Sequence, residues 1–150
     1  MSEQQAPLFE RRLDSHRKLK ALLQARTDAL VSFSRLAAMR PFRPHPAVRR
    51  MLHEFCRSLA DYVEAAHGLL YRFHERGAEK RQDVREVADC VYPRIADTTR
   101  QILRFTDVYD SGERSDNLSK LAEDLSGLGE LLADRILMED KLLDVHMRGR

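Results

Sequence analysis

The sequence predicts an all-α protein, an antiparallel up-down four-helix bundle in which a proline breaks the third helix. Four long stretches place apolar residues at three- and four-residue steps, which is the period of a helix. No stretch alternates with the period of two that marks a strand. Helices of about 25–30 residues with one apolar stripe each, joined by short connections, pack most simply around a shared core.

The length of 150 residues is that of one domain. A composition of 43% hydrophobic and 33% charged residues fits a folded helical chain and excludes wholesale disorder. No run reaches the ~18 apolar residues of a membrane span, and the first eight residues form no apolar signal region. Cys56 and Cys90 fit no disulfide framework. We therefore expect one cytoplasmic domain over 1–150, frayed at about 1–8 and 147–150.

The first two helices are separated by a proline-rich connection. The first is expected over about 9–39, where leucines recur at helical steps. Three prolines within 40–46 then end it, because proline fixes φ and has no N–H to donate. The second helix is expected over about 47–75, with Gly77 as its stop. Gly68 lies inside this helix, where the missing side chain favours the close approach of another backbone.

The third stretch predicts two helices, over about 83–91 and 94–108, because Pro93 interrupts the helical spacing of its apolar residues. A turn-rich linker follows. A serine or aspartate at 115–116 is the expected N-cap of the fourth helix, which runs to about Val145 with leucines at close to coiled-coil steps.

Net charge is distributed unevenly along the chain. Eleven basic and four acidic residues give 1–50 a net charge of +7, whereas 51–112 carry −2 and 113–150 carry −3. The basic excess follows one amphipathic segment and is not interleaved with groove-reading side chains. We interpret it as a solvated face and expect no direct contact with nucleic acid.

A metal site is one alternative for the second helix. Glu64-Ala-Ala-His67 matches half of the paired Glu-x-x-His motif of di-iron bundles, but the fourth helix offers no second copy. We therefore expect no metal ligands and no cofactor, and a metal-binding bundle enzyme or sensor is the alternative function. Cys56, one turn after His53, is expected to be a core thiol, because mid-helix amides cannot form an oxyanion site. No enzymatic activity is predicted.

Three charged residues fall on or near the apolar stripes. Arg26 lies on the stripe of the first helix, and Arg135 and Glu139 lie one turn apart near that of the fourth. Buried charges must pair and satisfy their hydrogen bonds. We expect an Arg–Glu–Arg cluster near one end of the bundle, which either holds the helices together or lines a small polar cavity.

The second helix also offers a candidate binding face opposite its apolar stripe. Residues spaced three and four apart gather there: Glu54, Arg57, Ser58, Asp61, Glu64 and Gly68. Three carboxylates make the face mildly acidic, and Tyr71 and Phe73 flank it. A rigid acidic helix face can dock a basic helical domain. A solvated face, or an adaptor surface for another signalling protein, stays open.

Several segments recur in order over roughly residues 17–143: FCRSLADYVEAAH at 55–67, YP at 92–93, IADTTRQI at 95–102, YDS at 109–111, LSGLGEL at 125–131 and EDKL at 139–142. In this order and spacing the chain resembles the Rsd/AlgQ family, the bacterial regulators of sigma D.

The resemblance implies an anti-sigma factor. Members of this family are helical bundles that bind region 4, the C-terminal domain of the housekeeping sigma factor. They hide the surfaces that region 4 uses for RNA polymerase core and for the promoter −35 element. The aspartate of the segment F-C-x-S-L-x-D-Y contacts sigma, and here it is Asp61. Region 4 carries a basic helix-turn-helix, so an acidic contact is expected. Gly68 stands where some relatives carry a phenylalanine.

Overall fold

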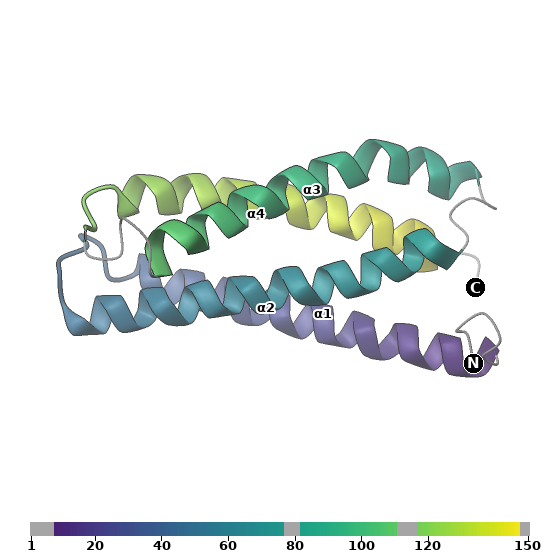
Figure 1. Cartoon of the computed structure of the whole chain (residues 1–150), viewed down its shortest axis with the longest axis horizontal. Coiled ribbons are helices and arrows are strands. Elements are labelled where there is room, and N and C mark those ends of the chain that lie inside the picture. The colour runs from purple at the N-terminus through teal and green to yellow at the C-terminus, as the bar shows by residue number, and fades with distance from the viewer. Residues whose placement is uncertain (1–7, 77–81, 111–116, 148–150) are drawn as a thin grey trace.

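Four helices make up the molecule in the computed structural model, which describes residues 8–76, 82–110 and 117–147. They are α1 (Leu8–Ala37), α2 (Pro46–Arg76), α3 (Gln82–Asp110) and α4 (Leu121–Met147). Figure 1 shows that they alternate in direction, so that α1 begins and α4 ends at the same end of the molecule. The predicted all-α four-helix bundle is confirmed, and the described ranges contain no strand.

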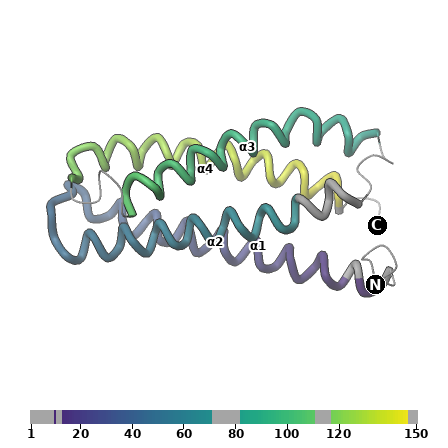
Figure 2. The backbone as a smooth tube through the Cα atoms, in the orientation of Figure 1, coloured from purple at the N-terminus to yellow at the C-terminus, as the bar shows by residue number. Residues whose placement is uncertain are grey.

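Neighbours in sequence are neighbours in space. α1 packs along α2, α2 along α3, and α3 along α4, as the short connections predict. In the tube view of Figure 2, α2 and α3 lie in front of α4 and α1, and they diverge toward the end of the molecule where α1 begins. This divergence matters below, because a groove lies between α2 and α3.

The main core lies between the helices, and each helix gives it one stripe of buried side chains. Val84 of α3 and Val145 of α4 form a second, small cluster. No helix in the described ranges is apolar enough along its length to cross a membrane. Phe55 of α2 lies at the centre of this core. Its ring centroid is 5.8 Å from those of Phe33 on α1 and Phe105 on α3, edge-on in both cases. Edge-to-face contacts of this kind favour one relative placement of the three helices.

Phe33 also explains a glycine on α4. A Cβ built on Gly129 would lie only 2.8 Å from Phe33 Cζ, so any side chain here displaces the ring. A Cβ on Gly127 meets nothing within 4 Å. The two glycines of the LSGLGEL segment therefore differ, and of the two only Gly129 lies against a side chain of α1.

The prediction of a third helix broken by Pro93 is wrong. α3 is one helix from Gln82 to Asp110 with Pro93 inside it. Proline removes one N–H, so the carbonyl of Asp89 lacks its helical donor. Pro93 is exposed, however, which leaves that carbonyl on the solvent side, where water can hydrogen-bond to it. Val91 and Ile95 are buried on either side, and they hold both halves of the helix against the same core.

α4 begins later than its expected cap. Residues 117–120 precede it as a turn, in which Asn117 Oδ1 accepts a 3.1 Å hydrogen bond from the amide of Ser119. The proposed cap at 115–116 lies outside the described residues, and so do the expected stop Gly77 and the terminal segments 1–7 and 148–150. The helices themselves already include Leu8 and Met147.

Candidate functional site

The candidate binding surface lies along the outside of α2, opposite the side that carries Phe55. Most of its predicted residues form one stripe, which we call the outer α2 face: the exposed Glu54, Arg57, Asp61 and Glu64, and the half-buried Gly68. Their steps of three and four residues follow the helical period, so the side chains lie one above another. The other side of α2 is fixed in the core, which gives this face a rigid support.

Ser58 does not belong to the outer α2 face. Its side chain is half-buried, and its Oγ lies 3.3 Å from Ser32 Oγ of α1. One residue of a helix turns it by about 100°, so a position beside the stripe can face a neighbouring helix. Ser58 therefore joins α1 to α2, whereas the sequence placed it among the partner-binding residues.

Asp61 carries the best placed carboxylate of the outer α2 face. It is exposed and has no hydrogen-bond or ion-pair partner among the described residues. Two other exposed aspartates are paired, Asp97 with Arg100 and Asp110 with His53. Asp89, Asp107 and Asp134 are exposed without a partner among the described residues, as Asp61 is, but they lie on α3 and α4. The carboxylate of Asp61 is thus available to a cationic group of a partner.

Gly68 leaves the C-terminal end of the outer α2 face without a side chain. A Cβ built on Gly68 meets nothing within 4 Å among the described residues, so no other part of the described chain approaches it closely. The expected close approach of another backbone does not occur there. The side chains of Tyr71 and Phe73, the predicted flanks of this face, lie outside what the structure describes.

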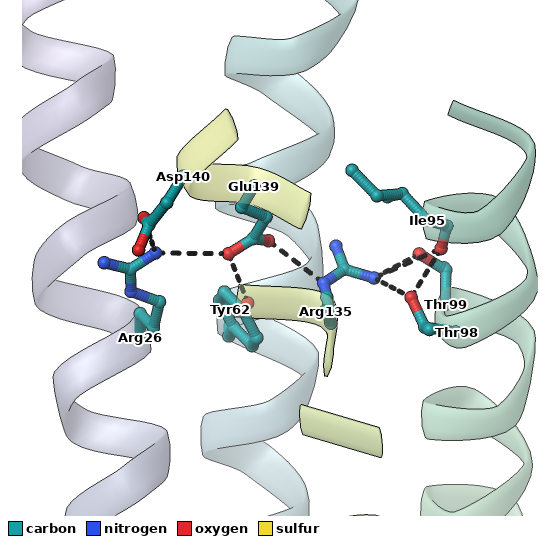
Figure 3. A network of polar contacts seen from close by, with 8 residues as sticks. All are labelled: Arg26, Tyr62, Ile95, Thr98, Thr99, Arg135, Glu139 and Asp140. Carbon is teal, nitrogen blue, oxygen red and sulfur yellow. Dashed lines mark hydrogen bonds and ion pairs between the residues drawn. The ribbon is translucent and has the colours of Figure 1, made fainter. Parts of the chain in front are cut away.

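A buried polar layer crosses the bundle beneath this face, and Figure 3 shows its members. Glu139 of α4 is at its centre and is fully buried. Its Oε1 accepts a 2.5 Å hydrogen bond from the hydroxyl of Tyr62, and its Oε2 accepts a 3.0 Å hydrogen bond from Arg135 Nε. Arg26 Nη1 lies 3.5 Å from Oε1 and donates to Asp140 Oδ1 at 2.9 Å.

Arg135 extends the polar layer to α3. Its Nη1 donates to Thr99 Oγ1 at 2.7 Å and to Thr98 Oγ1 at 3.1 Å, and it lies 3.4 Å from the carbonyl oxygen of Ile95. Its guanidinium carbon lies 5.2 Å from the centre of the Tyr62 ring, within cation–π range. Arg135 is only 1% exposed, so these contacts replace the water that its charge requires.

The structure thus brings Arg26, Arg135 and Glu139 together, as expected, but near the middle of the helices rather than near one end. Sequence reasoning missed Tyr62 and Thr98 as their polar partners. A signal existed: Arg26, Tyr62, Thr98 and Arg135 follow one another at steps of 36, 36 and 37 residues. In an up-down bundle of equal helices, successive equal steps return the chain to the same height only at the middle of each helix, so these steps indicate a level halfway along the bundle.

Electrostatics within the polar layer favour charged arginine and neutral tyrosine. Burial lowers the pKa of Arg26, but the hydrogen bond to Asp140 and the negative charges of Asp140 and Glu139 outweigh burial and raise it. Burial, supported by the charge of Glu139, raises the pKa of Tyr62 far above its usual range, although Arg135 opposes the shift. Tyr62 therefore remains a hydrogen-bond donor to the carboxylate.

Two alternative sites on α2, a metal site and a reactive thiol, were considered from the sequence, and the described residues assemble neither of them. Glu64 and His67 are both exposed, and no group of three or more potential metal ligands occurs in the part of the chain that the structure describes. Cys56 is buried, and burial, with the charge of Asp110, raises its pKa to about 12. His53 Nδ1 lies 2.6 Å from Asp110 Oδ1, so Asp110 is the partner of this histidine.

Fold and site together define a class of architecture: a helical bundle with a buried polar layer and a charged outer helix face. A family model described as "Regulator of RNA polymerase sigma(70) subunit, Rsd/AlgQ" matches residues 1–147. The chain belongs to this Rsd/AlgQ family.

Individual relatives agree with the family match. The chain is 32% identical over 128 residues to "Regulator of sigma D" of Sodalis glossinidius (strain morsitans), covering 83% of this chain and 84% of that protein. It is 31% identical over 144 residues to "Regulator of sigma D" of Shigella dysenteriae serotype 1 (strain Sd197) and to that of Escherichia coli (strain K12 / DH10B). These two alignments cover 91% of this chain and 87% of each relative. No solved structure matches the chain.

Proposed function

We propose that this protein is an anti-sigma factor that binds region 4 of the primary sigma factor in the cytoplasm. Bound in this way, it blocks the contacts of region 4 with RNA polymerase core and with the promoter −35 element. Membership of a family of sigma(70) regulators supports the general role. The observation that carries the proposed site is the exposed carboxylate of Asp61, which has no partner among the described residues.

The proposed contact is electrostatic at its centre. Region 4 binds DNA through a helix-turn-helix, and such surfaces present lysine and arginine to phosphates. Asp61 lies on the outer α2 face between Arg57 and Glu64, one helical turn from each. A guanidinium of the partner can therefore pair with Asp61 and lie close to Glu64. Charge complementarity of this kind selects the partner and sets its orientation.

In this proposal the bundle fixes the position of Asp61 and takes no part in a covalent reaction. Tyr62 follows Asp61 directly and is fixed in the core by Glu139 and Arg135. The backbone that carries Asp61 is therefore ordered before a partner arrives, which lowers the entropy cost of binding. The proposed action is one-to-one sequestration, in which no covalent bond is made or broken.

A pull-down with purified sigma region 4 tests this proposal. Wild-type protein is expected to retain region 4 at micromolar concentrations, and Asp61→Ala is expected to weaken the complex about tenfold or more. Asp107→Ala is the matched control, because Asp107 is an exposed aspartate that belongs to α3 and not to the outer α2 face. Failure of the wild-type protein to bind would remove the proposed function. Equal binding by Asp61→Ala would remove only the site.

A further inference from the structure

A groove between α2 and α3 has a chemical character that the proposed function does not use. Of the outer α2 face, only Glu64 also lines this groove. Its volume is about 1110 Å³, which is in the range of small-molecule sites. Its walls are mainly apolar, with Val63 and Leu70 from α2 and Ile95 and Leu103 from α3. The groove lies where α2 and α3 diverge in Figure 1.

Arg135 of α4 lies at the bottom of this groove. Its Nε and Nη1 donate to the polar layer, but Nη2 makes no hydrogen bond to the described residues. Arg135 is 1% exposed, so its two remaining N–H donors can reach an acceptor only through the groove. A buried guanidinium with unused donors at the base of an apolar groove is an anchoring point for an oxygen acceptor.

The charges around Arg135 favour an acceptor with no more than one negative charge. Arg135 and Glu139 are both buried and pair with each other, and Arg26 pairs with Asp140 at 2.9 Å, so the polar layer is neutral. The lining of the groove adds the carboxylates of Glu64 and Asp89 and the guanidinium of Arg85. A single carboxylate can accept a charge-assisted hydrogen bond from Arg135 Nη2. A phosphate dianion would bring a second negative charge close to the carboxylates of Glu139, Glu64 and Asp89.

The shape of the groove favours a slender ligand. The acceptor must reach the bottom of the groove, whereas an α-helix of a partner protein is about 10 Å across and brings its own bulk. An unbranched alkyl chain fits between apolar walls and carries its carboxylate at one end. We propose that the groove between α2 and α3 binds a small amphipathic monocarboxylate, such as a medium-chain fatty acid, with its carboxylate on Arg135 Nη2. This inference does not depend on sigma binding.

Calorimetric titration of the full chain with decanoate tests the inference. We expect saturable one-to-one binding below about 1 mM. Decan-1-ol, which has the same chain without the charge, is expected to bind at least about tenfold more weakly, because a charge-assisted hydrogen bond is lost. The alcohol tests the role of the charge while leaving Arg135, which the polar layer needs, unchanged.

Two matched variants locate the bound ligand. Ala96 is an exposed residue that lines the groove, so Ala96→Trp fills the groove while every side chain of the polar layer is kept. Ala122 is an exposed alanine of α4 outside the groove, and Ala122→Trp is the control for adding a large side chain. Decanoate binding is expected to be lost in the first variant and kept in the second.

Three results would overturn the inference: no saturable binding of decanoate, equal binding of the alcohol, or undiminished binding by Ala96→Trp. If decanoate fails to bind while Ala96→Trp loses affinity for sigma region 4, the groove belongs to a protein partner and the small-ligand inference is wrong. Failure of sigma region 4 to bind any variant would count against the proposed function and would leave the decanoate result intact.

Discussion

At the scale of single residues, Tyr62 shows how one side chain can serve two purposes. Its ring belongs to the hydrophobic stripe of α2, and its hydroxyl donates to the buried carboxylate of Glu139. Helical periodicity predicts the first role, because Tyr62 is in phase with Phe55 and Leu69. It cannot predict the second, since the carboxylate that accepts the hydrogen bond comes from a helix 77 positions away.

The hydroxyl of Tyr62 provides a direct test of the polar layer. We expect Tyr62→Phe to lower the free energy of unfolding by about 1–3 kcal/mol, because it leaves a buried carboxylate short of a donor. Tyr92→Phe is the matched control. The hydroxyl of Tyr92 donates to the neutral carbonyl of Leu70 at 3.0 Å, so its loss is expected to cost only about 0.5–1.5 kcal/mol. Urea unfolding measures both, and equal losses would contradict the account.

Tyr62→Phe is also expected to change how the free energy of unfolding depends on pH. The pKa of Tyr62 is raised in the folded state, so the stabilisation from its protonated hydroxyl is complete below the unfolded pKa of about 10 and is lost as pH rises above it. The stability of the wild-type protein is therefore expected to fall more steeply than that of Tyr62→Phe above about pH 10. Parallel curves from urea unfolding at several pH values would argue against a buried, protonated Tyr62.

At the scale of elements, α4 illustrates what a sequence pattern leaves out. The leucine period predicts its apolar stripe, and the structure buries Leu121, Leu125, Leu128 and Leu132 accordingly. The same pattern does not separate Gly127 from Gly129. The ring of Phe33, brought from α1 by the fold, lies against only one of them.

These two glycines form a matched pair of tests. Gly127→Ala is expected to stabilise the protein by up to about 1 kcal/mol, because alanine favours the helix and meets open space. Gly129→Ala adds the same preference but pushes against Phe33, whose ring is held by Phe55 on another side. Overpacking costs about 1–3 kcal/mol, so Gly129→Ala is expected to be neutral or destabilising. Equal gains in melting temperature for both variants would contradict the proposed contact between α1 and α4.

In α3 a local rule, that proline ends a helix, predicts a break that the structure does not contain. Pro93 suggested two helices because proline disfavours a helix interior. The apolar residues on both sides keep one phase, however, and their burial holds a single helix together at the expense of one backbone hydrogen bond. Periodicity across a proline was the better guide than the proline itself, and tertiary packing decided between them.

At the scale of the whole molecule, the fold separates a rigid interior from the surface that the proposed function needs. The bundle and the exposure of the outer α2 face follow from the helical period, and the structure agrees with both. The level at which the charged residues meet was predicted wrongly, although the near-equal steps between Arg26, Tyr62, Thr98 and Arg135 indicate the middle of the bundle. Nor could the groove above Arg135 be predicted, since it arises from the divergence of α2 and α3.

The central claim is that Asp61 on the outer α2 face pairs with a cationic group of sigma region 4. The most direct measurement is a calorimetric titration of region 4 with wild-type protein and Asp61→Asn, at about 50 mM and 300 mM salt, where screening differs strongly. The account predicts one-to-one binding that is about tenfold weaker for Asp61→Asn at low salt, with a smaller difference at high salt. Identical affinities of the two proteins at low salt would contradict it.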